Sequence, residues 1–171
     1  MNISELKILF IQRVITAYRL DLLVQLCDKF YNVGIITSKG NDTGTLKQAH
    51  YNTALNEYNN LKIFQVPSIR IPYKGESRST SLFLYPKAIK YIHNYDIIVF
   101  EGTTNLINNI YLLPYAKLLR KKIIWWDAGY SLPNRTLKRK IIDNVVKPLV
   151  KMSDTQMAYS TLAKDYLAEF M

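Results

Sequence analysis

The chain has 171 residues, 49% of them hydrophobic and 21% charged, which is typical of one globular domain and excludes an intrinsically disordered chain. Its net charge of +10 favours anionic partners, although its wealth of Lys, Asn, Ile and Tyr is also what an AT-rich genome produces. We find no apolar run long enough to span a membrane, no signal peptide and no nucleic-acid-binding motif. We therefore expect a cytoplasmic protein that does not bind nucleic acid.

The hydrophobic pattern predicts strands that alternate with helices. In chain order we expect a strand at 7–12, a helix at 19–30, strands at 32–38 and 61–66, a helix at 82–93, a strand at 96–101, a helix at 105–120, a strand at 122–127, a helix at 134–152, a strand at 155–160 and a helix at 162–171. Pro114 is expected to kink or shorten the helix at 105–120. Two linkers, 39–60 and 67–81, interrupt the alternation, and the first contains a stretch compatible with a helix.

Most of the predicted strands are apolar on both faces, and most are followed by a helix. This pattern is typical of a parallel sheet that is covered by helices on both sides. We therefore predict a single doubly wound, Rossmann-like α/β domain over 1–171, with at least six mostly parallel strands. The first strand is expected to lie beside the strand at 96–101. The only cysteine, Cys27, excludes an internal disulfide and is expected to be a buried apolar thiol among leucines.

Ligands of open parallel sheets bind at the carboxyl ends of the strands, so the loops that follow the strands hold the candidate site residues. In the first loop, Arg13 and Arg19 offer forked donors for an anion and Tyr18 lies between them. The other reading of Arg19 is that it begins a helix and pairs with Asp21 or solvent. This loop has no glycine, so the glycine-rich turn of a nicotinamide or flavin site is missing.

The loop after the strand at 96–101 offers a carboxylate, Glu101, that can accept bonds from sugar hydroxyls. Gly102 and Thr103 precede a helix, where free backbone N–H groups suit a phosphate or a hydroxyl. The alternative is that this segment serves only as a helix cap, made by Thr104 or Asn105.

The loop after the strand at 122–127 follows two tryptophans, which are expected to face opposite sides of the sheet. Asp127 can orient an acceptor hydroxyl or cap the next turn, Gly129 permits close ligand approach, and Tyr130 offers an aromatic face to a sugar ring. We expect the site residues of all three loops to converge on one cleft.

The sequence does not identify catalytic residues, and it predicts neither a metal site nor a cofactor in this chain. His50 and His93 lack metal-ligand spacing, and His93 is expected at a helix end. Neither a Gly-x-Ser-x-Gly elbow nor a phosphate-binding Gly-x-x-x-x-Gly-Lys loop occurs.

Four stretches resemble the N-terminal domain of the family-4 retaining glycosyltransferases, which have two facing Rossmann-like domains. They are Tyr18-Arg19 with Leu22-Leu23, the segment Tyr95-Asp96-Ile97-Ile98-Val99, the turn Trp126-Asp127-Ala128-Gly129, and the basic-helix, strand and helix series that covers 151–160 and 163–167. Many members have a histidine before the glycine of that turn, where this chain has Asp127-Ala128.

The resemblance implies the acceptor-binding half of a hexosyltransferase-like enzyme of polysaccharide biosynthesis. The acceptor would be a glycan or a lipid-linked glycan. The nucleotide-sugar donor would bind a C-terminal domain that this chain lacks, or a partner chain that supplies it, so the chain alone is expected to be inactive. The alternative hypothesis is a free-standing, non-catalytic module that binds a phosphate or a nucleotide.

The predicted helix at 134–152 carries apolar residues near one face and basic residues around it. Such a helix can rest on an anionic membrane, as expected for a peripheral protein on the inner face. The alternative is an ordinary amphipathic helix with a solvated basic side. The candidate membrane-facing residues are Arg135, Lys138, Arg139 and Lys140.

Overall fold

The computed structural model describes residues 2–39, 50–71, 82–102, 105–127 and 137–170, and the side chains of all of these except Lys138 and Arg139. The strands are β1 Lys7–Ile11, β2 Asn32–Lys39, β3 Leu61–Pro67, β4 Ile69–Ile71, β5 Leu82–Leu84, β6 Ile97–Glu101, β7 Lys122–Asp127 and β8 Thr155–Ala158. The helices are α1 Ala17–Cys27, α2 Asn52–Glu57, α3 Ile89–Ile92, α4 Leu106–Leu118, α5 Leu137–Met152 and α6 Thr161–Ala168. Short 3₁₀ turns cover Ile3–Glu5 and Pro86–Ala88.

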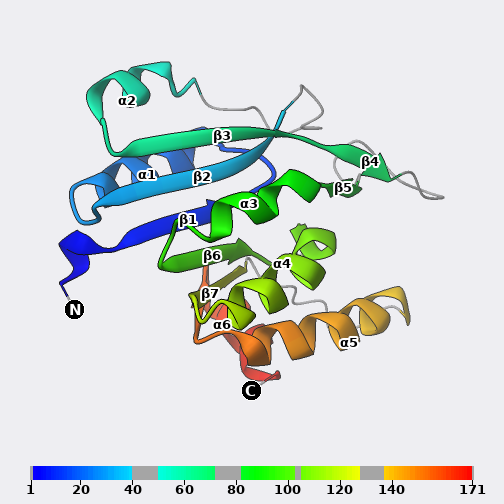
Figure 1. Ribbon diagram of the computed structural model, residues 1–171. Helices are drawn as coiled ribbons and strands as arrows, with labels where there is room; N and C mark the ends of the chain where they lie inside the picture. The colour runs from blue at the N-terminus through cyan, green and yellow to red at the C-terminus, as the bar shows by residue number, and fades with distance from the viewer. Residues whose placement is uncertain (1, 40–49, 72–81, 103–104, 128–136, 171) are drawn as a thin grey trace.

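Six strands form one sheet in the order β3-β2-β1-β6-β7-β8, and every neighbouring pair is parallel (Figure 1). This confirms the predicted doubly wound α/β fold and the pairing of the first strand with the strand at 96–101. The chain winds outward from β1 in one direction and then from β6 in the other. The strand order therefore reverses between β1 and β6, which is where ligands bind in folds of this kind.

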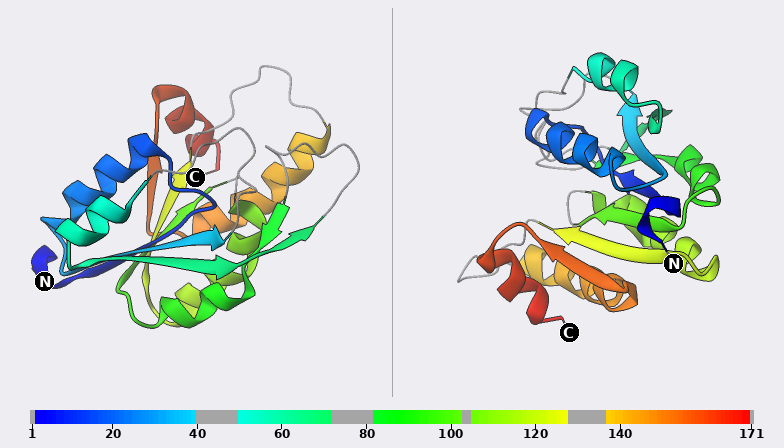
Figure 2. Two further views of the ribbon diagram at one scale, coloured as in Figure 1. Left: turned by 90° about the horizontal axis from the view of Figure 1, so that it is seen from above. Right: turned by 90° about the vertical axis from the view of Figure 1, so that its left-hand side faces the viewer.

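Two apolar clusters cover the two faces of the sheet, and Figure 2 shows the helices that lie on either side of it. One cluster packs α1 and α2 against Phe10, Ile35 and Trp126. The other packs α3, α4, α5 and α6 against Leu9, Phe100 and Trp125. The alternation of neighbouring strand residues between the clusters confirms that Trp125 and Trp126 face opposite sides of the sheet. Cys27 is buried in the cluster beneath α1, also as predicted.

The predicted helix at 82–93 is wrong over its first half. Leu82–Leu84 is strand β5, which pairs antiparallel with β4 inside the linker 67–81. The side-chain amide of Asn108 holds the extended backbone, because it donates to the Phe83 carbonyl and accepts from the Tyr85 N–H, both at 2.7 Å. Pro86 then opens the 3₁₀ turn, where its missing N–H costs nothing.

The remaining differences concern boundaries. Helix α1 begins at Ala17 and ends at Cys27, earlier at both ends than predicted, and α4 continues through Pro114 to Leu118. Within 39–60, the compatible stretch forms α2. His93 caps the C-terminus of α3, which confirms its expected place at a helix end. Among the described residues, no helix is long and apolar enough to cross a membrane.

Candidate functional site

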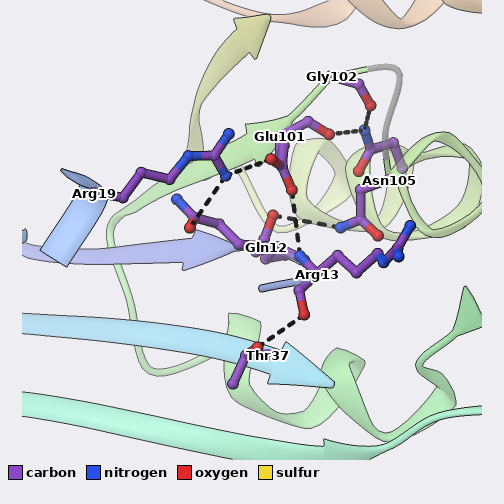
Figure 3. A network of polar contacts seen from close by, with 9 residues as sticks. Gln12, Arg13, Arg19, Thr37, Glu101, Gly102 and Asn105 are labelled. Atoms are coloured by element: carbon purple, nitrogen blue, oxygen red, sulfur yellow. Dashed lines mark hydrogen bonds and ion pairs between the residues drawn. The ribbon is translucent and has the colours of Figure 1, made fainter. Parts of the chain in front are cut away.

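The reversal of strand order places the ends of β1 and β6 side by side at the carboxyl edge of the sheet. Phe10 pairs with Val99 and Ile11 with Phe100, so the residues that follow β1 meet Glu101 at the end of β6. Figure 3 shows the polar network that results. Its centre is the Glu101 carboxylate, which is 7% exposed.

Glu101 forms a buried ion pair with Arg19 of α1. One carboxylate oxygen accepts from Nη1 of Arg19, and the other accepts from the backbone N–H of Arg13 at 3.3 Å. The same Nη1 lies 3.5 Å from Oε1 of Gln12. Arg19 thus pairs with a strand-end carboxylate across the sheet rather than with Asp21. This contact explains why a carboxylate is buried at the end of β6, since a buried charge requires a partner.

Three aromatic rings surround the guanidinium of Arg19. Its central carbon lies 5.2 Å from the ring centroid of Trp126, 5.6 Å from that of Tyr159 and 5.7 Å from that of Tyr18. Such contacts between a cation and aromatic faces are attractive. Burial disfavours the charged guanidinium, but the charge of Glu101 outweighs it, so the pKa of Arg19 is raised. The guanidinium of Arg19 therefore keeps its positive charge at physiological pH.

The side chain of Arg13 turns away from Glu101 (Figure 3). Its guanidinium carbon lies 5.3 Å from the ring centroid of Phe83, and the residue is 8% exposed. The backbone carbonyl of Arg13 accepts from the Thr37 hydroxyl at 2.9 Å and thereby fixes the loop after β1 to the end of β2. Arg13 shapes the site through its backbone, while its side chain packs on Phe83 of β5.

Buried amides of α4 hold the end of β6 in place. Nδ2 of Asn109 donates to the carbonyls of Glu101 and Gly102 at 2.8 and 2.9 Å, and Nδ2 of Asn105 lies 3.4 Å from the Ile11 carbonyl. The side chain of Asn105 makes no cap bond to α4. Asn105 is the N-cap residue of α4, as one alternative held, but its amide links the helix to β1 instead of bonding to the first turn.

Asp127 lies on the other side of the sheet from Glu101. Its carboxylate accepts from the Trp125 indole at 3.2 Å and packs so closely on Gly102 that a Cβ atom there would overlap it. Gly102 thus serves the close approach of a carboxylate side chain. The structure places Tyr18, Arg19 and Glu101 side by side and joins Arg13 to Glu101 through its backbone N–H, whereas the carboxylate of Asp127 lies on the face of Trp125. The convergence of all these residues on one cleft stays a prediction, because Tyr130 lies outside the described residues.

Several polar atoms of the site make no hydrogen bond within the described part of the chain. They are Nε2 of Gln12, Oγ1 of Thr16, Nε of Arg19 and Oη of Tyr85. Gln12, Thr16 and Tyr85 are 1%, 6% and 0% exposed. Burial of Tyr85, and to a lesser extent the nearby charge of Glu101, raises the pKa of its hydroxyl well above the usual range. The hydroxyl therefore keeps its proton and remains a donor. Three of these four atoms therefore lie at the Arg19–Glu101 pair. One belongs to Arg19 itself, one to Gln12, which contacts Arg19, and one to Thr16, three residues before Arg19.

The other candidates are distributed as follows. Tyr18 is 63% exposed beside Arg19. Thr103, Gly129, Tyr130 and Arg135 lie outside the described residues, as do Thr104 and the rest of the loop after β7. Lys138, Arg139 and Lys140 belong to α5, and Lys140 is exposed. No cluster of His, Cys, Asp or Glu among the described residues is suited to a metal ion.

Gln12, Trp126 and Tyr159 also belong to this site, although their sequence positions do not predict it. Tyr159 follows β8 directly. The expectation that site residues lie just after the strands β1, β6 and β7 identifies Tyr159 as well, once it is extended to β8. Trp126 was assigned to the core. It is core, but its ring also supports Arg19 and stacks on Tyr159 with centroids 4.9 Å apart.

Comparisons with known proteins support the fold. No family model matches the chain, and no curated protein matches it. Among solved structures, Glycyrrhiza uralensis UGT73P12, complexed with glycyrrhetinic acid 3-O-monoglucuronide, matches 98% of this chain at 14% identity with a TM-score of 0.56. A candidate 2-keto-3-deoxygluconate kinase from Enterococcus faecalis matches 96% at 12% identity with a TM-score of 0.53. The UDP-GlcNAc 2-epimerase of Methanocaldococcus jannaschii matches 96% at 16% identity with a TM-score of 0.49.

The chain spans only part of each of these structures: 46% of the Glycyrrhiza protein, 61% of the Enterococcus protein and 42% of the epimerase. At these identities the similarity concerns the fold alone. The chain therefore has the Rossmann-like α/β fold that it shares with one domain-sized part of a plant UDP-glycosyltransferase.

Proposed function

We propose that this chain is the acceptor-binding half of a glycosyltransferase, which transfers a hexose or related sugar from a nucleotide sugar to a glycan or lipid-linked acceptor in polysaccharide biosynthesis. The observation that carries the proposal is the Arg19–Glu101 pair at the reversal of strand order, with the exposed ring of Tyr18 beside it. Carboxylates, guanidinium groups and aromatic faces together are the groups that recognise sugars and their phosphates.

In this proposal Glu101 is a positioning residue. It holds the guanidinium of Arg19 next to the exposed ring of Tyr18, which contacts the acceptor in this proposal. The nucleotide-sugar donor binds a second domain or a partner chain. The similarity to slightly less than half of UGT73P12 supports this division.

The proposal includes contact with an anionic membrane through α5. Leu137, Ile141 and Val145 recur every four residues on its exposed side, and they are 76%, 60% and 36% exposed. Lys140, Lys147 and Lys151 form a second exposed row beside them. An apolar row next to a row of lysines matches the acyl and headgroup layers of an acidic membrane.

The test uses the complete enzyme, with its donor-binding part supplied on the same chain or on a partner. Glu101→Gln keeps the shape of the side chain but removes the charge that holds Arg19, and we expect kcat/KM for the acceptor to fall about tenfold or more. The KM of the nucleotide sugar stays unchanged, and Glu101→Asp restores part of the loss. Asp154→Asn is the matched control, since Asp154 precedes β8 at the opposite edge of the sheet and pairs with Lys117.

The alternative, a free-standing module that binds a phosphate or a nucleotide, makes the opposite prediction. If the isolated chain binds inorganic phosphate or a nucleotide tightly, and if Glu101→Gln leaves transfer to the acceptor intact, the proposal is wrong.

A further inference from the structure

A cleft of about 460 Å³ opens at the outer edge of the sheet, where β8 leads into α6. It is lined by Gln156, Ala158, Tyr159, Ser160, Thr161, Lys164 and Leu167. Its size falls within the range of small-molecule sites, and so does its mostly apolar lining with a few polar groups. The polar network around Glu101 accounts for none of these residues except Tyr159.

Tyr159 joins this cleft to the Arg19–Glu101 pair. Its ring stacks on Trp126 at an interplanar angle of 21°, lies 5.6 Å from the guanidinium of Arg19 and is 39% exposed. Trp126 and Arg19 are buried, so the ring of Tyr159 is held in one orientation at the rim of the cleft. An aromatic ring with a fixed orientation and an exposed part is suited to stacking against the apolar C–H face of a sugar ring.

Polar groups surround this ring on the other walls. Nε2 of Gln156 lies 3.2 Å from the Ser153 hydroxyl, which leaves the amide carbonyl of Gln156 as an acceptor. The Ser160 oxygen accepts from the N–H of Ala163 at 3.2 Å. The exposed ammonium of Lys164 and the exposed hydroxyl of Thr161 add donors. One aromatic face with acceptors and donors around it matches a polyhydroxylated ring, whereas an anion site would require several cations.

We propose that the cleft between β8 and α6 binds a sugar residue of the acceptor glycan, which stacks on Tyr159 and bonds to Gln156, Thr161 and Lys164. This inference rests on the proposed function, because it extends the acceptor site outward from the Arg19–Glu101 pair. An acceptor of two or more sugars spans both places, with Tyr159 between them. The cleft then determines how the enzyme distinguishes longer from shorter acceptors.

The experiment measures binding of cellobiose, lactose and N,N′-diacetylchitobiose to the chain. The two signals are the fluorescence of Trp126 beneath Tyr159 and the amide NMR shifts of residues 156–164. We expect saturable shifts at millimolar sugar. Tyr159→Ala weakens binding about three- to tenfold, and Tyr159→Phe, which keeps the ring, restores it. Lys164→Ala weakens binding without touching the packing, since Lys164 is exposed. Tyr31→Ala and Lys29→Ala, at the opposite edge, are the matched controls.

Three results overturn the inference: none of the three disaccharides shifts these amides, inorganic phosphate alone reproduces the shifts, or Tyr159→Ala and Lys164→Ala bind as the unchanged chain does. The outcome for the proposed function is separate. Sugar binding at the cleft without any transfer by the complete enzyme removes the function and leaves the inference. Transfer with an unchanged acceptor KM in Tyr159→Ala and Lys164→Ala removes the inference and leaves the function.

Discussion

The ion pair of Arg19 and Glu101 contributes to stability as well as to the site. Both side chains are about nine-tenths buried, so removal of either partner leaves the other charge buried and unpaired, at a cost of about 3–5 kcal/mol in the free energy of unfolding. We expect losses in this range for Arg19→Met and for Glu101→Gln, measured by urea unfolding. The double variant should lose less than the sum of the two. Additive losses would show that the two groups do not interact.

Cys27 lies in the apolar cluster beneath α1, where its thiol donates to the Leu23 carbonyl at 3.4 Å. Burial and the nearby charge of Asp28 raise the pKa of this thiol to about 11. At pH 8 the thiolate is therefore roughly a hundredfold scarcer than in an exposed cysteine of pKa about 9. We expect iodoacetamide to label Cys27 slowly in the native chain and quickly in guanidinium, as followed by mass spectrometry.

The raised pKa of the Cys27 thiol also makes the stability of the fold depend on pH. The folded thiol retains its proton to higher pH than the unfolded thiol, so this group leaves stability unchanged below about pH 9. Stability then falls as the pH rises towards 11. Cys27→Ser or Cys27→Ala should lack this part of the alkaline decrease. Equally fast labelling of native and unfolded chains would contradict the buried placement of Cys27.

Part of the site could be predicted at the scale of single residues. Arg19 and Glu101 meet because parallel strands that are neighbours end at the same edge. The sequence is enough to place Glu101 at a strand end and Arg19 in the segment that follows the neighbouring strand. The face on which Asp127 lies is a separate matter, since the alternation of side chains along β7 puts it on the face of Trp125, opposite Glu101. The prediction of a common edge says nothing about the face, and it is the face that decides contact.

At the scale of elements, the strands of the parallel sheet were predictable because they are short apolar runs between polar loops. Strand β5 was not. Leu82–Leu84 continues into a helical pattern, and its extended form depends on β4 and on the buried amide of Asn108, which lies more than twenty residues away. A local pattern cannot reveal a partner that is so distant in the chain. Helix α1 begins two residues earlier than predicted, directly after its N-cap, Thr16, a residue type that is common at that position.

Helix α5 is the element that we expect to contact an anionic membrane. We expect the chain to bind vesicles that contain phosphatidylglycerol and to bind pure phosphatidylcholine vesicles weakly, as measured by co-sedimentation. Each lysine near an acidic surface contributes about 1 kcal/mol. Lys147→Glu with Lys151→Glu should therefore weaken binding more than tenfold, and Ile141→Ser should weaken it through the lost apolar contact.

The control for this experiment changes the same net charge elsewhere. Lys29 and Lys62 are exposed on other elements, so the Lys29→Glu, Lys62→Glu double variant alters the total charge as the α5 double variant does. If the two double variants lose binding equally, the attraction arises from the overall charge of +10 and not from α5. In that case α5 is an ordinary amphipathic helix with a solvated basic side.

At the scale of the whole molecule, the reversal of strand order decides which groups the carboxyl edge of the sheet offers to a ligand. Loops from β1 and β6 meet over a buried ion pair, and the loop after β1 has none of the glycines that let a backbone approach a pyrophosphate. The described part of the carboxyl edge therefore offers side chains rather than backbone N–H groups to a ligand. This arrangement favours recognition of hydroxyls over that of a nucleotide diphosphate.

These groups also determine how the isolated chain binds nucleotide sugars. The isolated chain should bind a nucleotide sugar weakly and should transfer no sugar, because Arg19 is already neutralised by Glu101 and the guanidinium of Arg13 packs on Phe83. A diphosphate requires several charges or N–H groups that are not already engaged. Isothermal titration of the isolated chain with UDP-glucose, UDP-N-acetylglucosamine and GDP-mannose should show no binding tighter than millimolar. Addition of the donor-binding part should then produce both tight donor binding and transfer. Micromolar affinity in the isolated chain would contradict the proposal that this chain binds the acceptor while another domain or chain binds the donor. It would favour the free-standing nucleotide-binding module.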